Sequence, residues 1–73
     1  MNVEIYSKDN CPFCDKAIGL AKLKKMDLTV KKLGTDFEMS DMLELFPTAR
    51  TFPQIVLEGK NIGGYTEFSE LIK

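Results

Sequence analysis

The sequence predicts an α/β protein with elements in the order βαβαββα and a four-stranded mixed sheet flanked by helices. Short β-favouring runs of alternating or continuous apolar residues predict strands over 3–6, about 27–33, 54–57 and 61–63. Apolar residues at helical spacing predict helices over about 12–25 and 67–72, and between them a helix whose apolar face runs from 39 to 46. A strand–helix–strand start implies two parallel strands joined by a right-handed crossover, and the closing hairpin adds two antiparallel strands.

The first helix is predicted by a proline and an apolar arc. A polar, turn-forming stretch at 7–10 separates the helix from the first strand. Pro12 suits the first helical turn, where its missing N–H would have no partner in any case. The arc that we expect to face the core consists of Ala17, Ile18, Leu20, Ala21 and Leu23.

The second helix has a predicted start, face and end. Thr35 and Glu38 have the spacing of a capping box. Pro47 disfavours helical geometry at the residue before it, so the helix should end at 46. The apolar face, at i, i+3, i+4 and i+7, consists of Met39, Met42, Leu43 and Phe46. We expect this Met-rich face to pack in the core, with a partner-binding groove as the alternative.

The last third predicts a hairpin and a short helix. A turn at 58–61 connects the strand over 54–57 to the short strand at 61–63. Thr66 is expected to cap the last helix, because a Thr hydroxyl can accept a bond from an unpaired N–H of the first turn. The helix has apolar residues at Phe68, Leu71 and Ile72.

Composition excludes several functions. The chain has 73 residues, enough for one domain, and ten Lys and Arg against eleven Asp and Glu leave no basic surplus for nucleic acid. No apolar run approaches the roughly 20 residues that span a bilayer, and from the first residues we expect no secretory signal. We therefore expect a cytoplasmic protein. The chain has no histidine, which excludes Ser-His or Cys-His catalysis and a four-ligand zinc site within one chain.

The only two cysteines lie where a helix is expected to begin. Cys11-Pro12-Phe13-Cys14 follows a strand and a loop, and this context predicts a redox pair. The i to i+3 spacing brings both sulfurs onto one helix face, close enough to bond. Unpaired N–H groups and a positive partial charge at the helix start stabilise a thiolate on Cys11. The thiolate is the reactive species, and an ordinary thiol with a pKa of about 8.5 is only roughly 3% ionised at pH 7.

We expect the two cysteines to have different roles. Cys11 is the exposed attacker, and Lys8 could add positive charge to it. Cys14 is more buried and acts second: it attacks the mixed disulfide on Cys11 and frees the substrate. A structural staple is a weaker hypothesis, because closing about four residues removes only roughly 2 kcal/mol of unfolded-state entropy. A zinc or iron–sulfur site shared between chains is a further alternative.

Three motifs together resemble the glutaredoxin family. Ile5-Tyr6-Ser7-Lys8 leading into Cys11-Pro12-Phe13-Cys14 resembles its active site, Thr51-Phe52-Pro53-Gln54 its Thr-Val-Pro segment, and Ile62-Gly63-Gly64-Tyr65 its Gly-Gly turn. They occur in the family's order at about its spacings. The resemblance covers nearly the whole chain and implies a single glutaredoxin-like domain, 1–73, of the dithiol CPFC type with a thioredoxin-like fold.

The resemblance also implies an activity. Glutaredoxins reduce protein disulfides and protein–glutathione mixed disulfides, with reduced glutathione as co-substrate and no bound cofactor. Cys11 would carry glutathione as a mixed disulfide and Cys14 would resolve it. Lys8 would face the glycine carboxylate of glutathione. Phe13, in place of the usual Tyr, would flank the tripeptide.

The other two motifs would supply the rest of a glutathione site. Pro53 would be a cis-proline that leaves the backbone of Phe52, larger than the usual Val, free to pair with the ligand like an added strand. Backbone N–H groups of Tyr65 and Thr66 would bind the γ-glutamyl carboxylate. Glu67 would pair with the ligand's ammonium. The expected binding residues are Lys8, Phe13, Thr51, Phe52, Pro53, Gly64, Tyr65, Thr66 and Glu67.

Two other functions remain open. A redoxin of similar length, recharged by thioredoxin reductase, usually has Trp-Ser-Gly-Phe where this chain has Ile62-Gly63-Gly64-Tyr65, and the absence of Trp argues for glutathione. An inter-chain iron–sulfur or metal carrier is the alternative outside enzymes. The expected partners are glutathione and disulfide-containing or glutathionylated proteins, with ribonucleotide reductase as one candidate. We expect a monomer that binds neither nucleic acid nor membrane.

Overall fold

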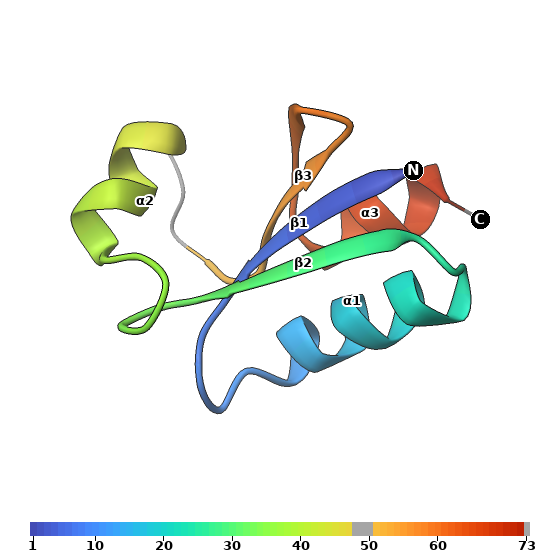
Figure 1. The fold of residues 1–73 in the computed structure, drawn as a ribbon, viewed down its shortest axis with the longest axis horizontal. Coiled ribbons are helices and arrows are strands. Elements are labelled where there is room, and N and C mark those ends of the chain that lie inside the picture. Colours follow the sequence, from blue (N-terminus) through green and yellow to red (C-terminus); the bar gives the residue numbers. More distant parts are fainter. Residues whose placement is uncertain (48–50, 73) are drawn as a thin grey trace.

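The computed structural model describes residues 1–47 and 51–72, and it confirms the predicted order of elements (Figure 1). The strands and helices are β1 (Asn2–Ser7), α1 (Pro12–Leu23), β2 (Asp27–Lys32), α2 (Met39–Leu45), β3 (Gln54–Leu57), β4 (Lys60–Gly63) and α3 (Tyr65–Leu71). No helix among these residues combines the length and the apolar character needed to cross a bilayer.

The sheet is mixed, as predicted, with strand order β2-β1-β3-β4. β1 and β2 run parallel, with partners from Asn2↔Asp27 to Ser7↔Lys32. β1 and β3 are antiparallel, as are β3 and β4. Figure 1 shows α1 and α2 on opposite sides of this sheet. β1 is an inner strand of the sheet, and the loop with the two cysteines follows its C-terminal end.

The main core lies between the sheet and the pair α1 and α3. Side chains alternate along a strand, so one set from β1 and β3 faces these helices. The buried residues of this core are Val3, Ile5, Ala17, Ala21, Ile55, Phe68 and Ile72. Because α1 contributes two alanines here, the helix can approach the sheet closely.

A smaller aromatic core attaches α2 to the opposite face of the sheet. The Tyr6 ring packs edge-on against Phe37 at 5.1 Å and against Phe46 at 5.2 Å between ring centroids. Met42 is fully buried in the same cluster. Edge-to-face rings add stability beyond the area they bury. The cluster therefore holds the C-terminal end of α2 against the sheet.

Two expected apolar faces are narrower than predicted. On α1, Leu23 is 74% exposed, so the buried stripe ends at Ala21. On α2, Met42 and Phe46 are buried, but Met39 and Leu43 are each 45% exposed. The prediction that the whole Met-rich face packs in the core is wrong for these two residues, because only one layer of α2 side chains reaches the aromatic core.

The predicted capping residues of α2 and α3 are wrong. The N-cap of α2 is Glu38, whose N–H donates to Asp41 Oδ2 at 2.9 Å, whereas Thr35 lies in the turn before it. The N-cap of α3 is Gly64, whose N–H donates to Glu67 Oε1 at 3.0 Å. Thr66 therefore lies inside the first turn. In both helices an acidic residue at the third position selects the cap, one half of a capping box.

Candidate functional site

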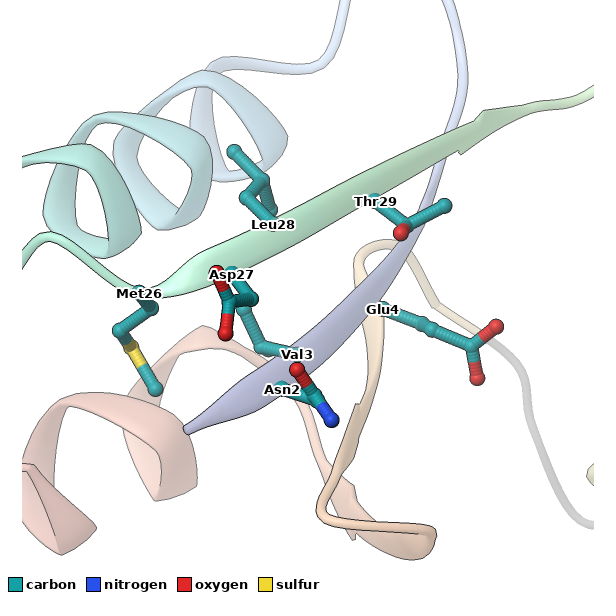
Figure 2. Close-up of a pocket in the computed structure, with 7 residues that line it drawn as sticks. All are labelled: Asn2, Val3, Glu4, Met26, Asp27, Leu28 and Thr29. Carbon is teal, nitrogen blue, oxygen red and sulfur yellow. The ribbon is translucent and has the colours of Figure 1, made fainter.

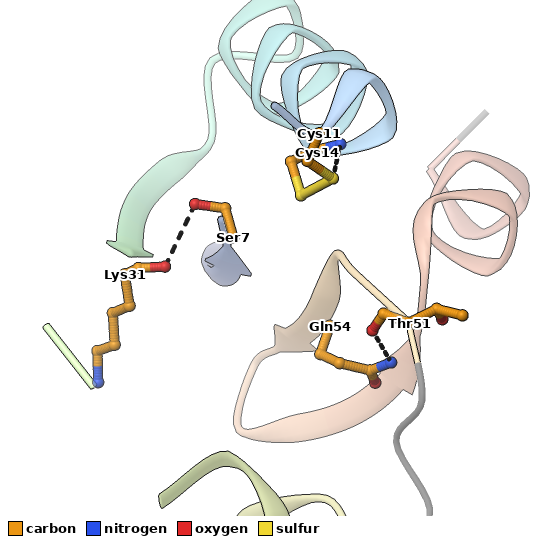
Figure 3. Close-up of a disulfide and its surroundings, with 6 residues drawn as sticks. All are labelled: Ser7, Cys11, Cys14, Lys31, Thr51 and Gln54. Carbon is orange, nitrogen blue, oxygen red and sulfur yellow. Dashed lines mark hydrogen bonds between the residues drawn. A yellow bond between two sulfur atoms is a disulfide. The ribbon is translucent and has the colours of Figure 1, made fainter. Parts of the chain in front are cut away.

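Cys11 and Cys14 form a disulfide at the start of α1 (Figure 3). Cys11 is the N-cap, with an extended backbone, and its Cα lies 5.2 Å from that of Cys14. The N–H of Cys14 donates to Cys11 Sγ at 3.2 Å. Once the disulfide is reduced, this donor and the positive end of the helix both favour a thiolate on Cys11. The local geometry that the spacing predicted is therefore present.

The burial of the two cysteines differs from the prediction in one respect. Cys14 is 1% exposed and Cys11 is 7% exposed. The expectation of an exposed Cys11 is wrong for this oxidised state, because its sulfur is bonded to a buried one and accepts the N–H of Cys14. Cys11 is still the less buried of the two.

The loop before Cys11 is tied to the end of β2. Asn10 has a positive φ of 54°, a conformation that Asn tolerates better than most residues. Lys32 Nζ lies 2.6 Å from Asp9 Oδ1, and this hydrogen bond raises the pKa of Lys32 above its ordinary value. The hydroxyl of Ser7 donates to the carbonyl of Lys31 at 3.3 Å (Figure 3). The loop is therefore bonded to the end of β2 at two points.

The second motif has the predicted proline geometry. The Phe52–Pro53 peptide bond is cis, which confirms the expectation drawn from the family resemblance. The Gln54 side-chain amide donates to the carbonyl of Thr51 at 2.8 Å and ties the two ends of this bend together (Figure 3).

The three motifs meet in one groove of about 280 Å³. Phe13 contributes one wall, and its ring lies 6.0 Å from that of Tyr65. An alanine-like Cβ on Gly64 would lie 3.4 Å from the Pro53 carbonyl oxygen, so the two motifs are in contact. Eight of the nine predicted binding residues line the groove: Phe13, Thr51, Phe52, Pro53, Gly64, Tyr65, Thr66 and Glu67.

Lys8 is the predicted residue that lies outside the groove lining. Its Nζ is 5.5 Å from the centroid of the Phe52 ring, a cation–π geometry. Phe52 in turn stacks on Phe37 at 6.4 Å. The ammonium is therefore held at the rim of the groove by a ring that lines it.

Sequence reasoning missed three contacts around the site. Lys16 Nζ lies 4.9 Å from the centroid of the Phe13 ring, a pair that the i to i+3 spacing on a helix could have indicated. The hydrogen bond from Gly64 N–H to Glu67 was missed because Thr66, and not Gly64, was predicted to cap α3. The Lys32–Asp9 pair joins residues distant in the sequence, so no local pattern could have indicated it.

A larger pocket, about 480 Å³, lies at the other end of the parallel strands. Figure 2 shows that its side chains do not converge: Leu28 points toward α1, while Glu4 and Thr29 point the other way. Within residues 1–47 and 51–72, no three His, Cys, Asp or Glu side chains gather to hold a metal ion.

A buried disulfide at a helix start beside a groove defines a thiol–disulfide oxidoreductase. The family model for glutaredoxin matches residues 3–62 of this chain. Glutaredoxin 3 of Escherichia coli is 34% identical over 65 residues, covering 86% of this chain and 76% of that protein. Glutaredoxin-1 of vaccinia virus is 30% identical over 77 aligned positions, covering 94% and 69%. The chain belongs to the glutaredoxin family, and its Cys11–Cys14 pair is the redox-active disulfide.

Solved structures agree with this assignment. Oxidised E. coli glutaredoxin superimposes with a TM-score of 0.82 at 25% identity, covering 100% of this chain and 94% of that one. Wheat glutaredoxin gives a TM-score of 0.79 at 29% identity, covering 94% of this chain and 68% of that one. The thioredoxin-like architecture is thus the family's own.

Proposed function

We propose that the chain is a glutathione-dependent oxidoreductase that reduces protein disulfides and glutathione mixed disulfides, with residues 1–73 acting as one domain. The observation that carries this proposal is the groove, in which segments from three parts of the sequence meet beside the disulfide. Its eight lining residues are all among the nine that the family resemblance implied. A reducing compartment such as the cytoplasm would keep the cysteine pair available for turnover.

The chemistry divides between the two sulfurs. The Cys11 thiolate attacks a substrate disulfide, forms a mixed disulfide, and releases one substrate thiolate, which takes up a proton. Cys14 then loses its proton and attacks Cys11 Sγ, which frees the second substrate thiolate and leaves the oxidised protein. Two glutathione molecules restore the dithiol and leave as glutathione disulfide. The lower exposure of Cys14 suits the second step, because its target is Cys11 Sγ in the same motif and not a sulfur of a molecule in solution.

The groove offers a place for each end of glutathione. Phe13 and Tyr65 would flank the tripeptide, and the backbone of Phe52 would pair with its cysteine. The ammonium of Lys8, held over the Phe52 ring at the rim, would face the glycine carboxylate. Glu67 would pair with the ligand's ammonium. The N–H groups of Tyr65 and Thr66 would bind the γ-glutamyl carboxylate.

The protein substrates on this proposal are disulfide-containing or glutathionylated proteins. Ribonucleotide reductase is one candidate, because it is reduced through thiols by members of this family. On this proposal the groove would accept an extended chain, and the flanking Phe13 is 54% exposed, which leaves it accessible to a protein surface.

Glu67→Gln tests the groove without disturbing the fold. A glutamine oxygen can still accept the Gly64 N–H, so the start of α3 should be retained, and only the charge is lost. We expect the apparent KM for glutathione to rise about 3- to 10-fold, the effect of losing one partly solvated charge-assisted hydrogen bond. The matched control is Glu70→Gln, which removes the same charge from an exposed position of the same helix.

Lys8→Ala tests the other end of the groove and should also raise the apparent KM for glutathione. An unchanged KM in both Glu67→Gln and Lys8→Ala, with wild-type turnover, would contradict the proposed mode of glutathione binding. An equal rise in Glu70→Gln would show a general charge effect instead of a contact.

A further inference from the structure

A second hollow, of about 260 Å³, lies behind the redox pair. The groove is lined by Phe13 and by residues from 51–53 and 64–67, whereas this hollow is lined by Cys14 together with the loop, α1 and β2. Figure 3 shows β2 and Ser7 on one side of the disulfide, and Thr51 and α3 on the other. The full lining is Ser7, Lys8, Asp9, Asn10, Cys14, Asp15, Ile18, Val30 and Lys32.

The resolving step needs an exit for a proton. Cys14 must become a thiolate before it attacks Cys11 Sγ, because the thiol is a poor nucleophile. At that moment a substrate is bonded to Cys11 and occupies the groove. Cys14 is 1% exposed, so its proton has to leave through the side that is not occupied. The hollow is open to solvent on that side and reaches Cys14.

We propose that the hollow behind the disulfide is the route by which Cys14 loses its proton, and that the Asp9–Lys32 ion pair at its rim tunes that step. The inference rests on the proposed roles of Cys11 and Cys14. Asp9 and Lys32 act through Cys14 and not on the substrate, so they are positioning residues.

The charges around the hollow come from three elements. The loop supplies Lys8 and Asp9, α1 supplies Asp15, and β2 supplies Lys32. The ammonium of Lys8 is directed to the Phe52 ring. The hydrogen bond to Asp9 raises the pKa of Lys32, so the Lys32 ammonium keeps its charge at neutral pH. A cation near Cys14 favours its thiolate and an anion disfavours it, so the two members of the pair oppose each other.

The step balances without an added reagent. Cys14 gives its proton to water in the hollow, and its thiolate forms a bond to Cys11 Sγ. The bond between Cys11 and the substrate sulfur breaks, and the substrate leaves as a thiolate with the bonding electron pair. Cys14 is oxidised and the leaving substrate sulfur is reduced, while Cys11 stays at the disulfide level throughout.

A coloured disulfide separates the two chemical steps. Reduced protein is mixed with dithiobis-nitrobenzoate in a stopped-flow instrument, and each step releases one coloured thiolate. The fast phase reports attack by Cys11, and the slow phase reports resolution by Cys14. The slow phase is recorded between pH 6 and 10 for wild type, Lys32→Gln, Asp9→Asn, the double variant and Lys32→Arg. Lys60→Gln, which removes a charge from an exposed residue at the other edge of the sheet, is the control.

Opposite shifts support the proposal. Lys32→Gln should slow the second phase at pH 7 by about 2- to 4-fold and shift its pH profile to higher pH, because fewer molecules then have Cys14 as a thiolate. The greater nucleophilicity of a more basic thiolate offsets only part of this loss. Asp9→Asn should shift the pH profile to lower pH. The profile of the double variant should lie between those of the two single variants, and that of Lys32→Arg should match wild type.

Unmoved profiles, or equal slowing in both single variants without a shift along the pH axis, would overturn the proposal and leave the pair a purely structural tie. The first phase distinguishes this from failure of the proposed function. If Cys11 attacks normally and the second phase ignores Asp9 and Lys32, only the exit route is wrong. Cys14→Ser should lose the slow phase and Cys11→Ser should lose the fast phase. If the fast phase persists in Cys11→Ser, the assignment of Cys11 as the nucleophile is wrong.

Discussion

Gly63 offers a sharp test, because two independent features of the structure make its lack of a side chain necessary. Its φ of +103° lies in the region that favours glycine. An added Cβ would lie 3.0 Å from Glu67 Oε1, 3.2 Å from Cδ and 3.3 Å from Cγ. Gly63→Ala therefore strains the backbone and displaces the Glu67 side chain from its bond to Gly64.

The size of the effect follows from the backbone. A non-glycine residue held in a sparsely populated region costs about 1–3 kcal/mol. A domain of this length has a free energy of unfolding of about 4–11 kcal/mol. A loss of about 2 kcal/mol would lower the Tm by roughly 8–16 °C, since each kcal/mol shifts it by about 4–8 °C. Displacement of Glu67 should also raise the apparent KM for glutathione.

Gly64→Ala is the matched control. Its φ is −102°, which any residue adopts, and its Cβ would make ordinary contact with the Pro53 carbonyl oxygen at 3.4 Å. We expect a change in stability below about 1 kcal/mol. Thermal unfolding followed by circular dichroism compares the two variants in the same buffer. Equal Tm values for Gly63→Ala and Gly64→Ala would refute the reasoning from backbone geometry.

Three further variants test other parts of the account. Cys14→Ser should keep activity on glutathione mixed disulfides, which glutathione itself can resolve, and lose reduction of protein disulfides; equal loss in both assays would contradict this. Met42→Ala should lower the free energy of unfolding in urea by about 2–5 kcal/mol. Met39→Ala, at a more exposed position of the same helix, should change the free energy of unfolding by less than about 0.5 kcal/mol. Similar losses in both variants would contradict the packing of α2 described above. Glu4→Gln tests linkage, because the hydrogen bond to Glu4 raises the pKa of Lys31. A raised folded-state pKa contributes stability that is fully present below the unfolded pKa. Glu4→Gln should therefore cost about 0.2–0.5 kcal/mol at pH 7, a small loss because the two side chains are 36% and 39% exposed, and this loss should vanish once the pH rises above the raised pKa of Lys31. A difference that persists there would exclude the pair as its cause.

The elements were predictable because their signals are local. Alternation along 3–6 and helical spacing after Pro12 each reflect which face of one element is buried. The helix starts were less predictable, because a capping residue competes with its neighbours. Thr66 looked like the better cap by residue type, but Glu67 at the third position selects Gly64.

The candidate site was predictable only in part. The Cys11–Cys14 pair follows from spacing and context, and most of the groove follows from the family resemblance. The tie between Asp9 and Lys32 and the place of Lys8 over the Phe52 ring depend on how distant segments pack. No periodicity or motif encodes such contacts, so they required the three-dimensional structure.

NADPH consumption with a small disulfide substrate, measured in two coupled systems, tests the central claim most directly. One system contains glutathione and glutathione reductase, and the other contains thioredoxin reductase alone. The account predicts turnover in the first system only, and its loss in Cys11→Ser. Turnover in the second system only would contradict the role of glutathione while leaving the cysteine chemistry intact, and silence in both would contradict the proposed enzyme as a whole.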